Sequence, residues 1–487
     1  MRITLNRKTD IALRILAGIG IALIPAALWW LWARICGCDI LHSHPVISDE
    51  LGYWRLMYSF SECGLDFGTC GGIINGEPAW GHFGSHGLAP FFAWGWYARL
   101  FPWTQESLVQ ANFIMLEAAY ILFALLVHDD LWDMVFSGVV LLCWPYIFLY
   151  LCSSMMEIPC CAVMIVYTAL FIRYRKKKTR IRFALALCCV IYLTCMRYCY
   201  ALAAFPLLWE RCDYRIDKKT VIVMLFYALG IVAAYWFLTK FEAIYPEYIL
   251  IKADRIDLIG KIQLLWENFV LNVRKYFSCQ THETSEFFQR IISVVIAVLL
   301  CVRGLFGENR RFYFSLGLTV FGLILLNLIC YDIGYQKEYR VMGPMLVFVL
   351  LAVSNGKGSL WLKTAAALMA AAGLVIGVKQ IRGYGSRNEY NSFFLPNRFL
   401  QIEDVGDAVR ACFGEEKASF AIKVSESFET VVWVPPQIGV QWALGEEALK
   451  DAHTEYIISM AEPPIVPDNY TFVGEPMPQY KVFRRND

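Results

Sequence analysis

Long apolar segments separated by short basic clusters constrain the fold of this chain more than any other feature of its sequence. The first apolar run, residues 16–33, contains no charged residue, follows Arg2, Arg7, Lys8 and Arg14, and precedes no small-residue cleavage site. Of the 487 residues, 58% are hydrophobic and only 18% are charged, which is too apolar for a soluble globular protein. We therefore expect a polytopic membrane protein whose N-terminus lies in the cytoplasm.

The later basic clusters predict the direction of each crossing, because loops rich in Lys and Arg stay in the cytoplasm. Clusters at 173–182, 211–219 and 303–311 are all expected on that side. About eleven spans satisfy this rule, with the C-terminus outside. They are expected at 16–33, 106–127, 131–151, 157–172, two short helices within 181–210 that meet near Arg197, 220–241, 287–302, 312–331, 340–354 and 359–378. The aromatic segment 87–101 suits an interfacial or re-entrant helix.

The chain divides into a membrane part and a soluble tail. Residues 1–380 form an all-α transmembrane region, with an external loop at 36–87 and a second at 242–286 whose amphipathic pattern suits the bilayer surface. From residue 381 the composition becomes that of a small soluble domain, so residues 381–487 are expected to form an external α/β domain. A helix is predicted at 403–413 and strands at 419–424, 430–434, 455–459 and 480–483.

Charge and cysteine content narrow the function classes. A net charge of +2 gives no indication of nucleic-acid binding. Most of the 17 cysteines lie in apolar runs, where a thiol behaves as a small hydrophobe. Cys36, Cys38, Cys63 and Cys70 share the first external loop. A disulfide between Cys63 and Cys70 is one possibility. A metal site there is disfavoured because no regular Cys and His spacing accompanies them.

Polar residues that the predicted topology places on the external face indicate a site of chemistry. The segment SDELGYW (48–54) puts two carboxylates before an aromatic run at the membrane surface, where charge is costly unless it is used or paired. The candidates are Asp49 and Glu50; His82 and His86 in GHFGSHG; Glu157 in SSMMEIP; Arg197; and Lys337, Glu338 and Arg340 in YQKEYRVMGP.

Each candidate also has an ordinary structural explanation. Asp49 and Glu50 could simply open a solvated helix, and Arg340 could be a positional charge at a helix end. Glu157 suits the N-terminus of a helix because of the helix dipole. His82 and His86 are most often hydrogen-bonded loop residues, and a metal role is the lesser alternative because other ligands are absent from the sequence around them.

The same segments resemble the GT-C superfamily of membrane glycosyltransferases, which use polyprenyl-phosphate sugars, and more closely its protein O-mannosyltransferases and aminoarabinose transferases. The resemblance covers most of the membrane part. It is carried by SDELGYW, by SHGLAPFFAWGWYARLF followed by TQESLVQANFIML, by MEIP, by EYRVMGP, and by an external soluble tail. The chain departs from the pattern at His86-Gly87, where relatives often carry Lys-Pro or Pro-Pro, and at Arg197, which has no firm counterpart.

Transfer from a lipid-phosphate donor needs a base and an anion-binding group. A positioned carboxylate can deprotonate the acceptor hydroxyl as it attacks the anomeric carbon, and Asp49 is the candidate, as the resemblance also implies, with Glu50 as the second catalytic carboxylate. The departing lipid phosphate needs permanently charged donors, for which Arg340 is suited, with Arg197 or Lys337 assisting. No cofactor is firmly implied, and a requirement for a divalent cation is left undecided by the sequence.

We therefore expect an inverting glycosyltransferase of the bacterial inner membrane. Its donor would be a polyprenyl-phosphate sugar, and its acceptor a hydroxyl of a glycan, a lipid or a protein on the external face. An O-antigen ligase or polymerase is the alternative enzyme, which the acidic first loop disfavours. A lipid or small-solute transporter would need polar residues within its spans, and the chain has a few, at Gln110, Asn112, Glu117 and Asn327. It would also need two inverted halves, and the sequence shows no such repeat.

Overall fold

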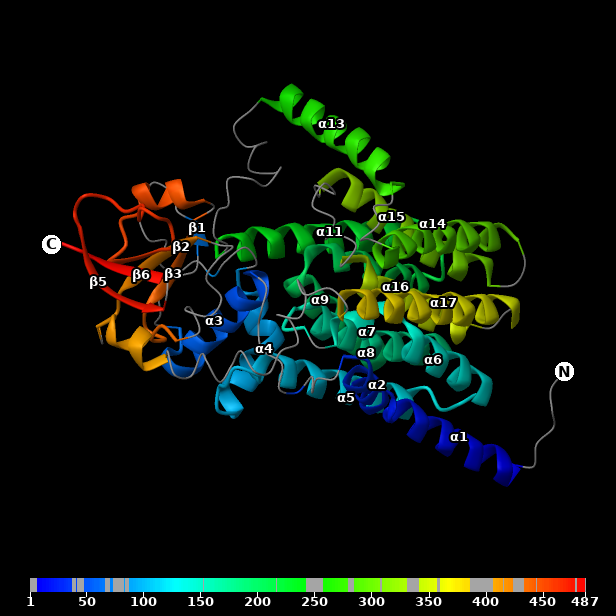
Figure 1. The fold of residues 1–487 in the computed structure, drawn as a ribbon. Helices are drawn as coiled ribbons and strands as arrows, with labels where there is room; N and C mark the ends of the chain where they lie inside the picture. The colour runs from blue at the N-terminus through cyan, green and yellow to red at the C-terminus, as the bar shows by residue number, and fades with distance from the viewer. Residues whose placement is uncertain are drawn as a thin grey trace.

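A helical bundle that carries a small β-sheet at one end makes up the computed structural model of the chain (Figure 1). We call the two ends of the molecule the sheet end and, because of its Arg and Lys residues, the basic end; α1 begins at the basic end. The structure describes residues 7–36, 41, 48–65, 71–72, 83, 87–151, 153–215, 217–241, 257–278, 284–306, 309–330, 341–356, 360–385, 406–414, 416–423, 433–443, 445–477 and 480–486.

The described helices follow the apolar segments of the sequence closely. They are α1 (Arg7–Ala22), α2 (Ile24–Cys36), α3 (Ser48–Cys63), α4 (Ala89–Leu100), α5 (Ser107–Leu126), α6 (Leu131–Cys143), α7 (Pro145–Tyr150), α8 (Glu157–Lys176), α9 (Arg180–Met196), the 3-10 helix η3 (Tyr198–Ala203), α10 (Ala204–Arg211), α11 (Lys218–Thr239), α13 (Leu258–Tyr276), α14 (Thr284–Leu305), α15 (Arg310–Cys330), α16 (Met342–Ser354) and α17 (Leu360–Gly385).

Six of these helices, α5, α8, α11, α14, α15 and α17, are long and apolar enough to cross a membrane. A seventh span forms if α1 and α2 are taken together, although they meet at a bend of 45°. Pro25 explains the bend, because proline lacks an amide hydrogen and its ring crowds the preceding turn. The chain is therefore a polytopic membrane protein. The count of eleven also includes the shorter helices α6, α9, α10 and α16, and it stays a prediction.

The helices differ in how deeply they lie in the bundle. In α8, 78% of the apolar span is buried inside the protein, whereas in α11 the share is 6%. All thirteen residues of α16 are buried as well, and α16 packs against α8. Helices α8 and α16 therefore form the centre of the bundle, and α11 presents its apolar side chains outward, where lipid would cover them.

Helix α13 forms the amphipathic segment expected in the second external loop. Its Asn268 and Asn272 side chains donate to the carbonyls of Ile329 (2.8 Å) and Leu328 (3.0 Å), which end α15 and have no partner within that helix. The opposite face, with Ile259 and Trp266, is exposed. Figure 1 shows α13 at the edge of the bundle, where an interfacial helix would lie.

The sheet has six strands in the order β1-β3-β2-β4-β6-β5, of which the first four are parallel and β5 and β6 are antiparallel. The strands are β1 (Gly71–Gly72), β2 (Ser419–Lys423), β3 (Gly439–Ala443), β4 (Tyr456–Ser459), β5 (Tyr470–Met477) and β6 (Tyr480–Arg485). A helix at 406–411 and the 3-10 helix η7 (Glu446–Asp451) accompany it. The tail is therefore an α/β domain, as the sequence predicts.

One strand prediction fails in its described part. Of residues 430–434, only 433 and 434 are described, and they form a turn. The reason is Pro435 and Pro436, which follow directly and cannot donate to a strand ladder.

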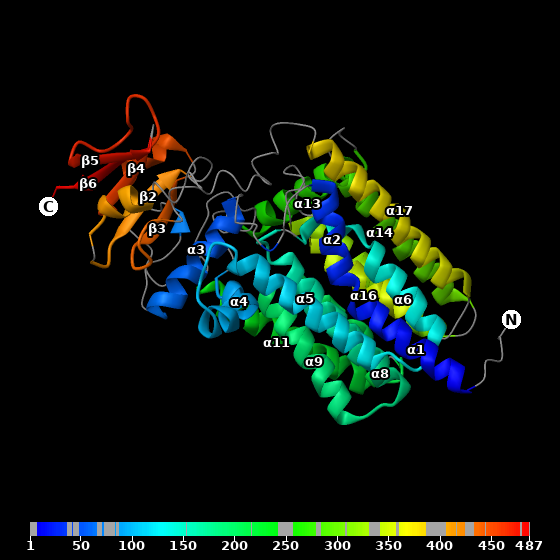
Figure 2. The same ribbon diagram turned by 60° about the horizontal axis from the view of Figure 1, so that its bottom comes forward.

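Helix α3 joins the first loop to the C-terminal domain. Leu51 is fully buried within the apolar core under the sheet. The buried guanidinium of Arg55 donates to the carbonyls of Val434, Pro435 and Ile438, the last at 2.7 Å. The first loop also supplies β1, which pairs with β3 as an edge strand. The two segments therefore form one structural unit beside the bundle (Figure 2).

We predict that Arg55→Met loosens this unit. The change leaves three carbonyls without their buried donor, at about 1–3 kcal/mol for each unsatisfied group, so the unfolding midpoint of the purified protein should fall. Hydrogen exchange should accelerate in peptides covering 433–443. The control is Arg484→Met in β6, where the arginine is exposed. Unchanged exchange in Arg55→Met would show that Arg55 does not hold the domain.

Candidate functional site

The acidic motif lies in the first turn of α3, and Glu50 faces the bundle. The Glu50 carboxylate is 3% exposed, and its Oε1 accepts a hydrogen bond from Ser153 Oγ (2.5 Å) and another from the Ser154 amide (2.9 Å). Both serines belong to SSMMEIP, the segment that leads into α8. A buried carboxylate needs such donors to offset its desolvation. Asp49 lies beside Glu50 in the same turn, and its side chain is outside the described part of the chain.

A buried asparagine on α5 fixes the turn that receives Glu50. Asn112 Nδ2 donates to the carbonyls of Ser153 (3.0 Å) and Met155 (3.1 Å). Asn112 Oδ1 accepts from Trp94 Nε1 of α4 at 2.7 Å. The amide thus satisfies its donors and its acceptor within the protein. Helices α3, α4 and α5 therefore converge on the start of α8.

Three of the four polar residues that a transporter could use within its spans, Gln110, Asn112 and Asn327, are engaged in similar local contacts. Tyr97 Oη donates to Gln110 Oε1 at 2.8 Å, and Asn327 Nδ2 contacts Met342 Sδ at 2.9 Å. With Asn112, these residues connect neighbouring helices rather than line a path. The contacts give a structural reason for their presence.

An ion pair connects the start of α8 to the end of α9. Glu157 is the first residue of α8 and is fully buried, and its Oε1 lies 2.7 Å from Nη2 of Arg197, whose side chain is 7% exposed. Each charge also suits its helix end, because the dipole favours an anion at an N-terminus and a cation at a C-terminus. Removing one partner of such a buried pair typically costs about 3–5 kcal/mol. Glu157 therefore holds Arg197 in place.

The start of α16 packs against the same region. Gly343 belongs to the segment EYRVMGP, and a Cβ at this position would collide with the ring of Tyr146 in α7. Only glycine permits so close an approach of α16. Tyr146 is also within electrostatic reach of the Glu157 carboxylate. The structure therefore brings three separate motifs to one place, at the N-termini of α3, α8 and α16.

Other predicted site residues lie outside the described residues. These are His82, His86, Lys337, Glu338 and Arg340, together with Cys38 and Cys70. Among the residues that the structure does describe, no group of three His, Cys, Asp or Glu side chains could hold a metal ion.

Sequence reasoning missed the residues that position the motifs. Ser153 and Ser154 bind Glu50, and Arg55 binds the C-terminal domain. Ser154 precedes Glu157 by three residues, the spacing of a helix-capping box, and this spacing was the available signal. Its partner lies about a hundred residues earlier, and periodicity and spacing carry no information on such a pairing.

Comparison with known proteins gives similarities to solved structures alone. No protein-family model matches the sequence, and no curated protein matches it. The structure is similar to the apo oligosaccharyltransferase of Archaeoglobus fulgidus, with a TM-score of 0.48 and 10% identity over 94% of this chain and 70% of that chain. It is also similar to ArnT from Cupriavidus metallidurans bound to undecaprenyl phosphate, with a TM-score of 0.41 and 10% identity over 96% and 97%.

A third similarity is to the archaeal oligosaccharyltransferase AglB from Archaeoglobus fulgidus in complex with an inhibitory peptide and a dolichol-phosphate. Its TM-score is 0.43, with 10% identity over 88% of this chain and 64% of that chain. These three likenesses concern the fold alone.

Proposed function

We propose that the chain is an inverting GT-C-type glycosyltransferase that transfers a sugar from a polyprenyl-phosphate donor to an acceptor hydroxyl. The observation that supports this most is the meeting of SDELGYW, SSMMEIP and VMGP (341–344) at one end of the bundle, with Glu50 bound to Ser153 and Ser154. These segments are far apart in the sequence, so their meeting is a property of the fold. The acceptor is a glycan, a lipid or a protein.

Within this site we assign the general base to Asp49 and a positioning role to Glu50. The Glu50 carboxylate already accepts two hydrogen bonds in a buried place, which suits an anchor. Successive residues of an α-helix lie about 100° apart around its axis, so Asp49 belongs to a different face of α3 from Glu50. The base would remove the proton from the acceptor hydroxyl as that oxygen attacks the anomeric carbon.

For the departing lipid phosphate we assign Arg340 as the principal ligand. It is covalently joined to Val341, so its Cα lies about 3.8 Å from that of this buried residue at the start of α16. A guanidinium can bind two phosphate oxygens at once and stays charged at any physiological pH. Lys337 belongs to the same segment, and Arg197, held by Glu157, adds a fixed positive charge at this end of the bundle.

We place the sheet end outside a bacterial inner membrane and the basic end in the cytoplasm. Helix α8 begins at Glu157 and ends in a basic turn with Arg173, Arg175 and Lys176. The positive-inside rule assigns that turn to the cytoplasm. The donor's lipid would then lie among the helices beneath an external site.

We predict that Asp49→Asn lowers turnover far more than Glu50→Gln does. Loss of the base should lower turnover of a polyprenyl-phosphate sugar by about 10²- to 10⁴-fold in Asp49→Asn, with an unchanged unfolding midpoint. In Glu50→Gln the amide oxygen can still accept from Ser153 and Ser154, so most turnover should remain. If Glu50→Gln loses turnover while remaining folded and Asp49→Asn keeps it, the two assignments are reversed.

We predict that Arg340→Lys weakens donor binding although it preserves the charge, because the ammonium group cannot form the planar double contact. Donor affinity and single-turnover rate should both decrease, by roughly 1–3 kcal/mol in total, and Arg340→Ala should be worse. Arg34→Lys, at an exposed arginine ending α2, is the matched control. A fully active Arg340→Lys variant would remove Arg340 from the site.

We predict that trypsin added to intact spheroplasts cleaves the C-terminal domain, where Arg410 and Lys450 are exposed. In inverted vesicles the same domain should be protected, and cleavage should occur near Lys177 and Arg180. Protection of the domain in spheroplasts, with cleavage of a known external control protein, would reverse the proposed orientation.

A further inference from the structure

A hollow at the basic end of the bundle lies far from the proposed glycosyltransferase site. It has a volume of about 770 Å³ and is bordered by the end of α8, by α10 and by the start of α15. Helix α8 has 20 residues, so at about 1.5 Å per residue its two ends are about 30 Å apart. The hollow therefore belongs to the opposite membrane surface from Glu157.

Basic side chains outnumber acidic ones around this hollow. Four of the lining residues are basic and two are acidic: Arg175, Lys176, Arg310 and Arg311, and Asp129 and Glu210. The neighbouring Glu308 lies outside the described residues and can add only one negative charge. An excess of positive charge therefore remains whether or not Glu308 lies near the hollow.

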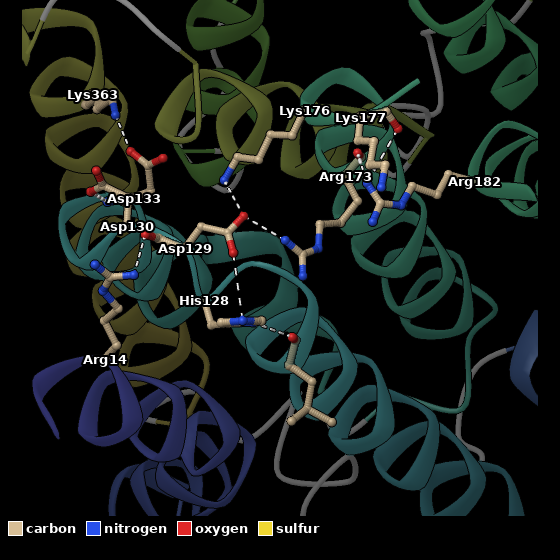
Figure 3. Close-up of polar contacts among 11 residues, drawn as sticks. Arg14, His128, Asp129, Asp130, Asp133, Arg173, Lys176, Lys177, Arg182 and Lys363 are labelled. Carbon is tan, nitrogen blue, oxygen red and sulfur yellow. Dashed lines mark hydrogen bonds and ion pairs between the residues drawn. The ribbon is translucent and has the colours of Figure 1, made fainter. Parts of the chain in front are cut away.

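The two acidic residues are already engaged with other cations. Asp129 Oδ2 lies 2.6 Å from Arg173 and 3.3 Å from Lys176, as Figure 3 shows. Burial alone would raise the pKa of Asp129, but Lys176 and Arg173 together hold it below its usual value. Glu210 lies 3.3 Å from Arg175 and 2.9 Å from Lys178. Neither carboxylate is left to neutralise the start of α15.

Arg310 and Arg311 supply the surplus charge. Both are exposed in the first turn of α15, which contains no acidic residue. Within the described part of the chain, neither side chain makes a hydrogen bond or an ion pair. Cations at a helix N-terminus are unfavourable because that end of the helix dipole is also positive. A bound anion would relieve the repulsion between the two arginines and their repulsion by the helix dipole.

The hollow also has an apolar side, which indicates what kind of anion fits. The guanidinium of Arg175 stacks over the ring of Phe312 at 3.4 Å, and Ile172 lies beside them in the lining. Both α8 and α15 are candidate spans, so their ends meet the bilayer at the level of the lipid headgroups. A ligand with a phosphate head and acyl chains would match the charge, the apolar side and the depth.

We propose that this hollow binds the phosphate headgroup of an anionic phospholipid from the leaflet at the basic end. The phosphate would lie between Arg310 and Arg311, with Arg175 and Lys176 on its other side. This site is separate from the donor site and does not depend on the proposed transferase activity. Free inorganic phosphate offers the same anion without acyl chains, so the experiment has to distinguish the two sources.

The test is native mass spectrometry of the purified full-length chain with added phosphatidylglycerol or phosphatidylcholine. We expect wild-type protein to retain phosphatidylglycerol in preference to phosphatidylcholine. In Arg310→Gln/Arg311→Gln its affinity should fall about 30-fold, or about 2 kcal/mol at 1.4 kcal/mol per factor of ten. Arg310→Lys/Arg311→Lys, which keeps both charges, should retain most of the binding.

Arg180→Gln/Arg215→Gln is the matched control, because these two arginines are exposed, belong to the other basic clusters and do not line the hollow. It should bind phosphatidylglycerol as the wild type does. Equal retention by Arg310→Gln/Arg311→Gln, or equal retention of phosphatidylcholine by the wild type, would overturn the proposal. Thermal stabilisation by inorganic phosphate equal to that by phosphatidylglycerol would overturn the assignment to a lipid.

Discussion

Two buried polar side chains on one short helix hold the C-terminal domain of this protein to its helical bundle. Glu50 is bound by the turn before α8, and Arg55, five positions later on α3, is bound by carbonyls of the C-terminal domain. These positions lie about 140° apart around the helix axis. Because leaving either group buried without its partners would be costly, α3 is fixed in both position and rotation. The placement of the acidic motif is therefore coupled to the docking of the C-terminal domain.

The bundle provides the rigid side of this arrangement. Helices α8 and α16 are the most deeply buried parts of it, and α16 approaches α7 so closely that Gly343 has no room for a side chain. The pair of Glu157 and Arg197 fixes the start of α8 against the end of α9. A site assembled from three helix N-termini gains precision from such contacts, since each helix can shift only if a buried charge or a close packing contact is lost.

Hydropathy predicted the helices well, and the pairings between them could not be read from it. The segment 106–127 corresponds to α5 at 107–126, because a long apolar run has only one way to satisfy its backbone in a membrane. By contrast, β1 consists of two glycines, too short for any alternating pattern, and β3 is buried on both faces, so it shows no alternation either. The partners of Glu50 and Arg55 depend on tertiary structure alone, although Glu50 stands in a recognised motif and Arg55 directly follows it.

The order of synthesis gives these contacts a further consequence. Arg55 and its acceptors Val434 and Ile438 are 379 and 383 positions apart in the sequence. The apolar spans between them can satisfy their own backbone hydrogen bonds as soon as each helix forms. The acceptors of Arg55 do not exist until the C-terminal domain has been made, and its edge strand β1 has to wait for β3 in the same way. The acidic turn of α3 therefore reaches its final position only when the last part of the chain has folded against it, so the site is completed after the bundle that supports it.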